Sequence, residues 1–113
     1  MAKIEAELRG NFDNILRDLH NTVIRGSRSA TLEESSDITV GDTRCSVRAY
    51  ERYSYFGGGR VSMNVTLLQA DGRVFVSVTS TGGSQAVFFK INTIGENSFL
   101  YTIRTAIDSY RIR

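Results

Sequence analysis

An imidazole and a thiol occur once each in this chain of 113 residues, at His20 and Cys45. A histidine can act as a general base near neutral pH, and a cysteine thiolate can act as a nucleophile or bind a metal. A structural metal site needs about four such ligands, and no set of that size is apparent. The sequence therefore predicts no metal and no cofactor. We interpret His20 as a helix-end or surface residue and Cys45 as a small, buried apolar residue.

A glycine-rich loop is the second candidate for chemistry. Gly82, Gly83, Ser84 and Gln85 follow a strand pattern, and such residues can present backbone N–H groups to an anion. The segment lacks the lysine of a phosphate-binding loop and leads into another strand pattern, where such a loop leads into a helix. We therefore expect a tight turn here. An enzyme that binds an anionic group at this loop is the alternative hypothesis.

A stripe of arginines is the third candidate. Arg44, Arg48 and Arg52 repeat every four residues in a predicted strand that also contains Tyr50. Side chains alternate between the two faces of a strand, so these four residues lie on the same face. Arginine and tyrosine are enriched in protein interfaces. The stripe predicts either a face that binds a partner chain, an acidic ligand or nucleic acid, or a solvated face paired with acids on a neighbouring strand.

Two helix patterns and a series of strand patterns must position these residues. Apolar residues recur at steps of three and four over 3–25 and again from residue 93 to the end, which predicts a helix at each end. Between them the period falls to two, which predicts about five strands, at 29–39, 43–56, 60–69, 73–79 and 85–91. Turn residues at 41–42 and 71–72 join neighbouring strands, so the sheet is expected to be an antiparallel meander.

We therefore predict a single α+β domain over residues 1–113, a two-layer sandwich with both helices on one face of the sheet. The other sheet face would be uncovered. From the alternation along each strand, that uncovered face is expected to carry Arg44, Arg48, Tyr50, Arg52, Ser62, Asn64, Thr66, Phe75, Ser77 and Thr79. The opposite face of the 43–56 strand, which includes Cys45, is expected to pack against the helices. Glu51 interrupts that apolar face, so we expect either a pair with an arginine or a bulge.

Composition limits the classes of function. Hydrophobic residues make up 41% of the chain and charged residues 23%, which is typical of a globular protein. The net charge of +2 argues against nucleic acid or an anionic membrane as a partner, although twelve of the 14 basic residues are arginine. No apolar run approaches the roughly 18 residues of a membrane span, and no signal peptide is apparent. With a lone cysteine, these features predict a cytoplasmic protein.

Three segments of the chain are distinctive. They are residues 50–55 (YERYSY), 58–62 (GGRVS) and 82–93 (GGSQAVFFKINT). Together they resemble a small bacterial protein family of unknown function, found mainly in Gram-positive organisms. That family has no assigned activity, so the resemblance implies a cytoplasmic bacterial protein and transfers no function.

The leading hypothesis is a non-enzymatic binding module that self-associates through the face or edge of its sheet. It rests on the arginine and tyrosine stripe and on the absence of a recognisable catalytic set. A homo-oligomer or another protein is the expected partner. An alternative is a pocket between the helices and the sheet that binds a small ligand or lipid of unknown identity. This pocket would be lined by Phe12, Phe88, Phe89 and Phe99.

Overall fold

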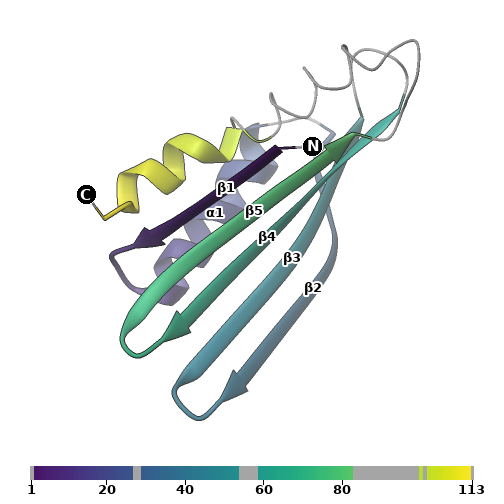
Figure 1. The fold of residues 1–113 in the computed structure, drawn as a ribbon. Helices are drawn as coiled ribbons and strands as arrows, with labels where there is room; N and C mark the ends of the chain where they lie inside the picture. Colours follow the sequence, from purple (N-terminus) through teal and green to yellow (C-terminus); the bar gives the residue numbers. More distant parts are fainter. Residues whose placement is uncertain (1, 27–28, 54–58, 83–99, 101, 113) are drawn as a thin grey trace.

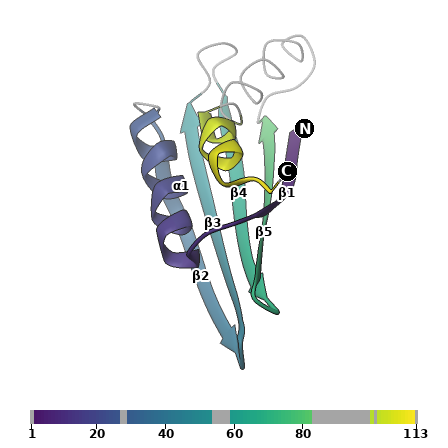
Figure 2. The same ribbon diagram turned by 90° about the vertical axis from the view of Figure 1, so that its left-hand side faces the viewer.

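The chain folds into a five-stranded antiparallel sheet with helices on one face (Figures 1 and 2). The computed structural model describes residues 2–26, 29–53, 59–82, 100 and 102–112. The elements are β1 (Ala2–Leu8), α1 (Phe12–Gly26), β2 (Thr31–Val40), β3 (Thr43–Tyr53), β4 (Arg60–Ala70), β5 (Arg73–Gly82) and a C-terminal helix over residues 102–110. The strand order is β1-β5-β4-β3-β2. The predicted α+β class, with a helix towards each end and a five-stranded antiparallel meander, is confirmed.

The N-terminal segment differs from its prediction. We expected a helix from residue 3, but residues 2–8 form strand β1, which pairs with β5. Ile4 and Leu8 are four positions apart in the sequence, which fits a helix, but this spacing also fits the period of two in a strand. Gly10, with a φ of 146°, then turns the chain. The predicted strand at 85–91 lies outside the described residues.

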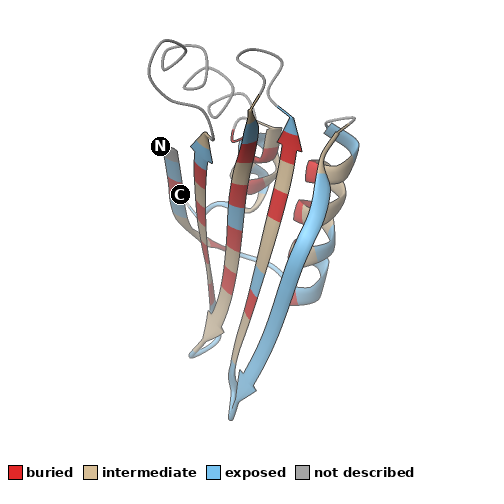
Figure 3. Cartoon of the chain, turned by 90° about the vertical axis from the view of Figure 1, so that its right-hand side faces the viewer, coloured by how far each residue is buried: buried red, intermediate tan, exposed pale blue. Residues whose placement is uncertain are grey.

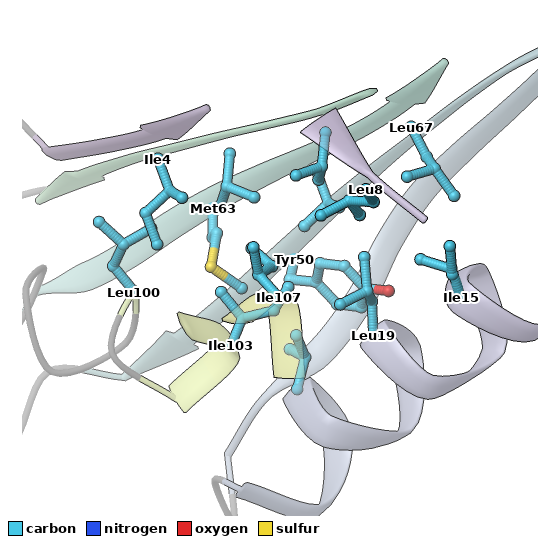
Figure 4. Close-up of a cluster of buried hydrophobic side chains, with 14 of the residues drawn as sticks. Ile4, Leu8, Ile15, Leu19, Tyr50, Met63, Leu67, Leu100, Ile103 and Ile107 are labelled. Carbon is cyan, nitrogen blue, oxygen red and sulfur yellow. The ribbon is translucent and has the colours of Figure 1, made fainter. Parts of the chain in front are cut away.

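Helix α1 begins where its sequence provides a cap. The Asn11 side-chain oxygen accepts a hydrogen bond from the backbone N–H of Asn14 at 3.0 Å, which satisfies one of the free donors of the first turn. One apolar stripe of the helix is buried against the sheet, formed by Phe12, Ile15, Leu19 and Val23. Figure 4 shows Ile15 and Leu19 of this stripe meeting core residues from β3, β4 and the C-terminal helix.

The hairpin between β4 and β5 follows its predicted turn chemistry. Asp71 and Gly72 have positive φ values of 54° and 71°, as the two central residues of a tight type I′ turn require. This turn fixes the register in which Leu67 faces Val76 and Met63 faces Ser80. All four of these residues are buried on the helix side of the sheet.

The two faces of strand β3 are reversed relative to the prediction. Its register pairs Tyr50 with Met63 and Arg48 with Val65, so the arginine and tyrosine stripe shares the face of the buried β4 residues. Tyr50 is only 2% exposed and Arg52 5%. The prediction that Arg44, Arg48, Tyr50 and Arg52 lie on the uncovered face is therefore wrong. Cys45, expected in the core, is half-buried on the uncovered face.

The two edges of the sheet differ. The outer edge of β1 is joined to the C-terminal segment by an isolated bridge between Leu8 and Arg111. In contrast, every residue of β2 is exposed, as Figure 3 shows with the helices behind the sheet. A small irregularity between Leu32 and Glu34 interrupts the pairing of β2 with β3. Beyond it, β2 is a regular edge strand.

Candidate functional site

The arginine stripe forms part of the contact between α1 and β3. Arg44 makes two hydrogen bonds to the Asp13 carboxylate, at 3.0 and 3.2 Å, and its guanidinium lies 4.3 Å from the centre of the Phe12 ring. Hydrogen bonding to Arg44 lowers the pKa of Asp13. Asp13 and Phe12, the two partners of Arg44, are at the start of α1, where the helix dipole also favours an acidic residue. Arg44 therefore has a structural role, because it links β3 to the start of α1.

Tyr50 also links β3 to α1. Its hydroxyl is 2.9 Å from Nδ1 of His20 on α1. Burial raises the pKa of Tyr50, and nearby Arg48 opposes this rise. Burial, together with the charge of Arg48, lowers the pKa of His20, so the imidazole favours its neutral form. His20 was interpreted as a helix-end or surface residue, but it is a half-buried link between α1 and β3.

Of the predicted glycine-rich loop, Gly82 alone lies among the described residues. Gly82 is the last residue of β5 and lies opposite Val61 of β4. Gly83, Ser84 and Gln85 lie outside the described residues, so the anion-binding hypothesis for this loop stays a prediction. Three of the four phenylalanines of the predicted ligand pocket, Phe88, Phe89 and Phe99, also lie outside them. That pocket stays a prediction as well.

The face of the sheet turned away from both helices, hereafter the open face, carries an apolar row across four strands. Ile38 of β2 lies opposite Cys45 of β3, Cys45 opposite Leu68 of β4, and Leu68 opposite Phe75 of β5. We call these four residues the apolar row. Residues directly opposite each other on one face have Cβ atoms about 5 Å apart, so the row is a continuous surface.

Further apolar side chains extend the row on the open face. Val47 and Val40 lie two residues from Cys45 and Ile38 along their strands and on the same face. Ile38 is 56% exposed, Val40 71% and Val47 36%. A shallow hollow continues past Phe75 towards β1, between Leu68, Ser77 and Glu5. Exposed apolar surface that is continuous over several strands is typical of an interaction site.

Small neutral polar residues surround the apolar row, as predicted for β4 and β5. Thr66 and Ser77 lie opposite each other, as do Asn64 and Thr79, all on the open face. Ser62 and Phe75 were also placed on this face correctly, since their neighbours Val61, Met63, Val74 and Val76 are buried. The centre of the open face is therefore neutral over its described residues.

Charged residues of the open face are mostly paired near its margins. Arg73 makes a bidentate contact with Glu7, at 2.8 and 3.0 Å, and lies 4.9 Å from the centre of the Phe75 ring. Hydrogen bonding to Arg73 lowers the pKa of Glu7. At the other end, Arg60 lies 3.0 Å from Glu51, which confirms the expected arginine pair of this acid. The open face thus has an apolar and neutral centre with ion pairs at its rim.

Sequence reasoning missed most of the apolar row. It placed Cys45 and Val47 against the helices because they alternate with three arginines, and an apolar face usually packs inwards. One available signal was Leu67-Leu68, since adjacent leucines in a strand must point to opposite faces. That pair implies apolar surface on both sides of β4.

Comparison with known proteins places the chain in a family. It matches the family described as "Family of unknown function (DUF6054)" over residues 1–111. The chain belongs to this family. The expected resemblance to a family of unknown function is therefore confirmed. The DUF6054 chain matches no curated protein and no solved structure.

Two kinds of feature are absent from the described part of the DUF6054 chain. No cluster of three histidine, cysteine, aspartate or glutamate side chains suited to a metal occurs among the described residues. Among the same residues, no helix has the length and apolar character needed to cross a membrane.

Proposed function

We propose that this protein is a non-enzymatic interaction module that self-associates through the open face of its sheet. The observation that carries the proposal is the apolar row, in which Ile38, Cys45, Leu68 and Phe75 adjoin across four strands on the face away from the described helices. We also infer a bacterial, cytoplasmic setting. Its support is the resemblance stated above and the lone thiol, which suits a reducing compartment.

The distribution of charge supports a second copy as the partner. In protein interfaces, charged residues are depleted at the core and polar residues form the rim. The open face has this arrangement, because Glu7 and Arg73 pair at one margin and Glu51 and Arg60 at the other. Its neutral centre does not repel an identical centre. A two-fold dimer uses the same patch on both subunits, so this self-compatibility is required.

Sedimentation equilibrium over a range of concentrations tests the proposal. We expect the wild-type chain to dimerise and Val47→Lys to weaken dimerisation by tenfold or more, on the order of 1.4 kcal/mol, because an unpaired ammonium would be buried. Val47 is 36% exposed in the single chain, so lysine can reach solvent in the monomer. Thr105→Lys adds the same charge on an exposed position of the C-terminal helix and should leave dimerisation unchanged.

Cys45 provides an independent readout, because it is the single cysteine and belongs to the apolar row. Its rate of reaction with a maleimide should fall as protein concentration rises, and Val47→Lys should shift this fall to higher protein concentrations. A wild-type chain that stays monomeric at every concentration, with constant Cys45 reactivity, would falsify self-association through the open face.

A further inference from the structure

Strand β2 is exposed on both of its faces. All ten residues from Thr31 to Val40 are exposed, including the apolar residues Leu32, Ile38 and Val40. Figure 3 shows the strand at the margin of the sheet, with α1 behind it. An edge strand has a row of backbone N–H and C=O groups without a neighbouring strand. β2 thus offers a long template for pairing with another chain.

The opposite edge of the sheet is covered by the chain itself. The backbone N–H of Arg9 donates to the carbonyl oxygen of Tyr110 at 2.8 Å, and that of Ile112 donates to the carbonyl oxygen of Glu7 at 3.0 Å. The Arg111 side chain also reaches the carbonyl oxygen of Glu5. These contacts occupy the later part of β1. Among the described residues, no comparable backbone contact occupies the outer edge of β2.

One amide of β2 is satisfied locally. The backbone N–H of Ser35 donates to the side chain of its own neighbour, Glu34, at 3.2 Å. An added strand would replace this single exposed contact with several backbone hydrogen bonds that form together. The regular part of β2 beyond the irregularity at Leu32 and Glu34 gives such pairing a uniform register.

The charge of β2 selects the kind of strand that can pair with it. The strand contains Glu33, Glu34 and Asp37 and no basic residue. Glu33 lies 3.8 Å from Arg60, whereas Glu34 and Asp37 make no ion pair within 4 Å among the described residues. They project to opposite faces of β2, since Glu34 lies opposite Ala49 and Asp37 opposite Ser46. Basic residues of an added strand could therefore meet an acid on either face.

A second copy of β2 does not fit this edge. An antiparallel pair of identical strands would place three acids from each copy along one seam, and β2 itself contains no basic residue to offset them. Like charges opposite or diagonal to each other destabilise strand pairing. Charged side chains on an edge are a common protection against edge-to-edge association of identical chains. Charge complementarity thus favours a different segment, one that carries lysine or arginine.

We infer that the outer edge of β2 binds an extended basic segment of another protein by strand addition. The backbone of β2 supplies the hydrogen bonds, and Glu34 and Asp37 supply the preference for lysine or arginine. Ile38 and Val40 on the open face, and Leu32 on the helix side, contact apolar residues of the segment. This inference concerns the backbone edge and its acids; it shares Ile38 with the apolar row but does not rest on self-association through the open face.

Capped peptides of about seven residues test the inference, since this length matches a typical strand. The binding probe alternates valine and lysine. One control alternates valine and glutamate, and a second repeats the basic sequence with N-methylated amides that cannot donate hydrogen bonds. We expect the first probe to bind and to slow hydrogen exchange in β2, and both controls to bind at least fivefold more weakly. Binding of the basic peptide should also weaken as salt is added.

A charge reversal of the edge completes the test. Glu34→Lys/Asp37→Lys should weaken the basic peptide at least fivefold and favour the acidic one. Thr105→Lys/Asp108→Lys raises the net charge on the C-terminal helix, away from β2, and should bind as the wild type does. Equal binding of all three peptides, or unchanged exchange in β2, would overturn the inference. β2 protection that grows with protein concentration alone would also overturn it, because a second copy would then occupy the edge.

The two proposals can fail separately. Val47→Lys should weaken self-association and leave peptide binding intact, whereas the reversal of Glu34 and Asp37 should weaken binding of the basic peptide and leave self-association intact. Loss of both properties in either variant would have to be checked against its folding by near-ultraviolet circular dichroism. A folded variant that loses both would show that edge and open face form one site, contrary to this inference.

Discussion

His20 and Tyr50 join α1 to β3 at the level of single side chains. Nδ1 of His20 lies 2.9 Å from the Tyr50 hydroxyl, and the two rings are inclined at 38°. A buried hydroxyl that loses its hydrogen-bond partner costs free energy, so this contact stabilises the position of both side chains. The polar face of β3 is therefore stable beneath a helix because α1 brings polar groups to it.

The stability of the fold should depend on the protonation of His20. Its pKa is lowered in the folded chain, first by burial and then by the charge of Arg48. The unfolded chain, with an ordinary pKa near 6.5, takes up a proton more readily. Stability is therefore present above about pH 6.5 and should fall as the pH is lowered through that value. Urea unfolding at a series of pH values between about 7.5 and 5.5 measures this effect.

Two variants serve as controls for the pH dependence. His20 is the only histidine, so His20→Gln should flatten the dependence in this range. Tyr50→Phe removes the hydroxyl and should cost about 1 kcal/mol at neutral pH. If His20→Gln keeps the wild-type dependence on pH, another group is responsible.

Among the elements, the crossing of α1 with the C-terminal helix depends on Gly26. A Cβ atom at Gly26 would lie 2.2 Å from Cγ2 of Thr102, which is too close for any real pair of atoms. Glycine is common at the end of a helix because it accepts a positive φ, and Gly26 has such a place in the sequence. It does end α1, but its φ is not positive. The close approach of the two helices is what excludes a side chain here.

Gly26→Ala should therefore destabilise the protein by about 1–3 kcal/mol, because the C-terminal helix must shift to avoid overlap. Thermal and urea unfolding measure the cost. In Gly26→Ala/Thr102→Ala the γ-carbon is absent, so the double variant should lose less stability than the sum of the single variants. Strictly additive effects would contradict a clash between these residues.

The elements also show where sequence patterns are ambiguous. Ile4 and Leu8 fit the period of a helix and that of a strand, and only pairing with β5 decides between them. In β3 the apolar residues Cys45 and Val47 suggested an inward face, but the register with β4 places Arg48 opposite the buried Val65 and Cys45 opposite Leu68. Strands β4 and β5 were predictable because, along each strand, valines that face the helices alternate with small polar residues that face the other way. The site was missed in β2 and β3 because open-face apolar residues resemble core residues.

Across the whole molecule, the C-terminal segment is part of the sheet's stability. The Ile112 amide and the Arg111 side chain donate to carbonyl groups of β1, which lie at the opposite end of the sequence. Such contacts connect the two ends of the chain. Removing residues 111–113 should lower the free energy of unfolding by about 1–2 kcal/mol, at roughly 1 kcal/mol for each lost hydrogen bond.

Denaturation by urea measures the effect of this truncation, and a chain that lacks only Arg113 is the control. The control should unfold at the wild-type midpoint, because the described contacts of β1 involve residues 110–112. Equal stability of both truncated chains would mean that these bonds to β1 contribute nothing measurable.

The unequal edges of the sheet also set a limit on assembly. A sheet with two open edges can accept a strand on either side, and repeated addition gives a fibre. Here the later part of β1 is already occupied by the C-terminal segment, and the acids of β2 oppose its pairing with a copy of itself. Growth of the sheet by one added strand would therefore stop after that strand. Complexes formed at this edge should be discrete, with a fixed number of partners.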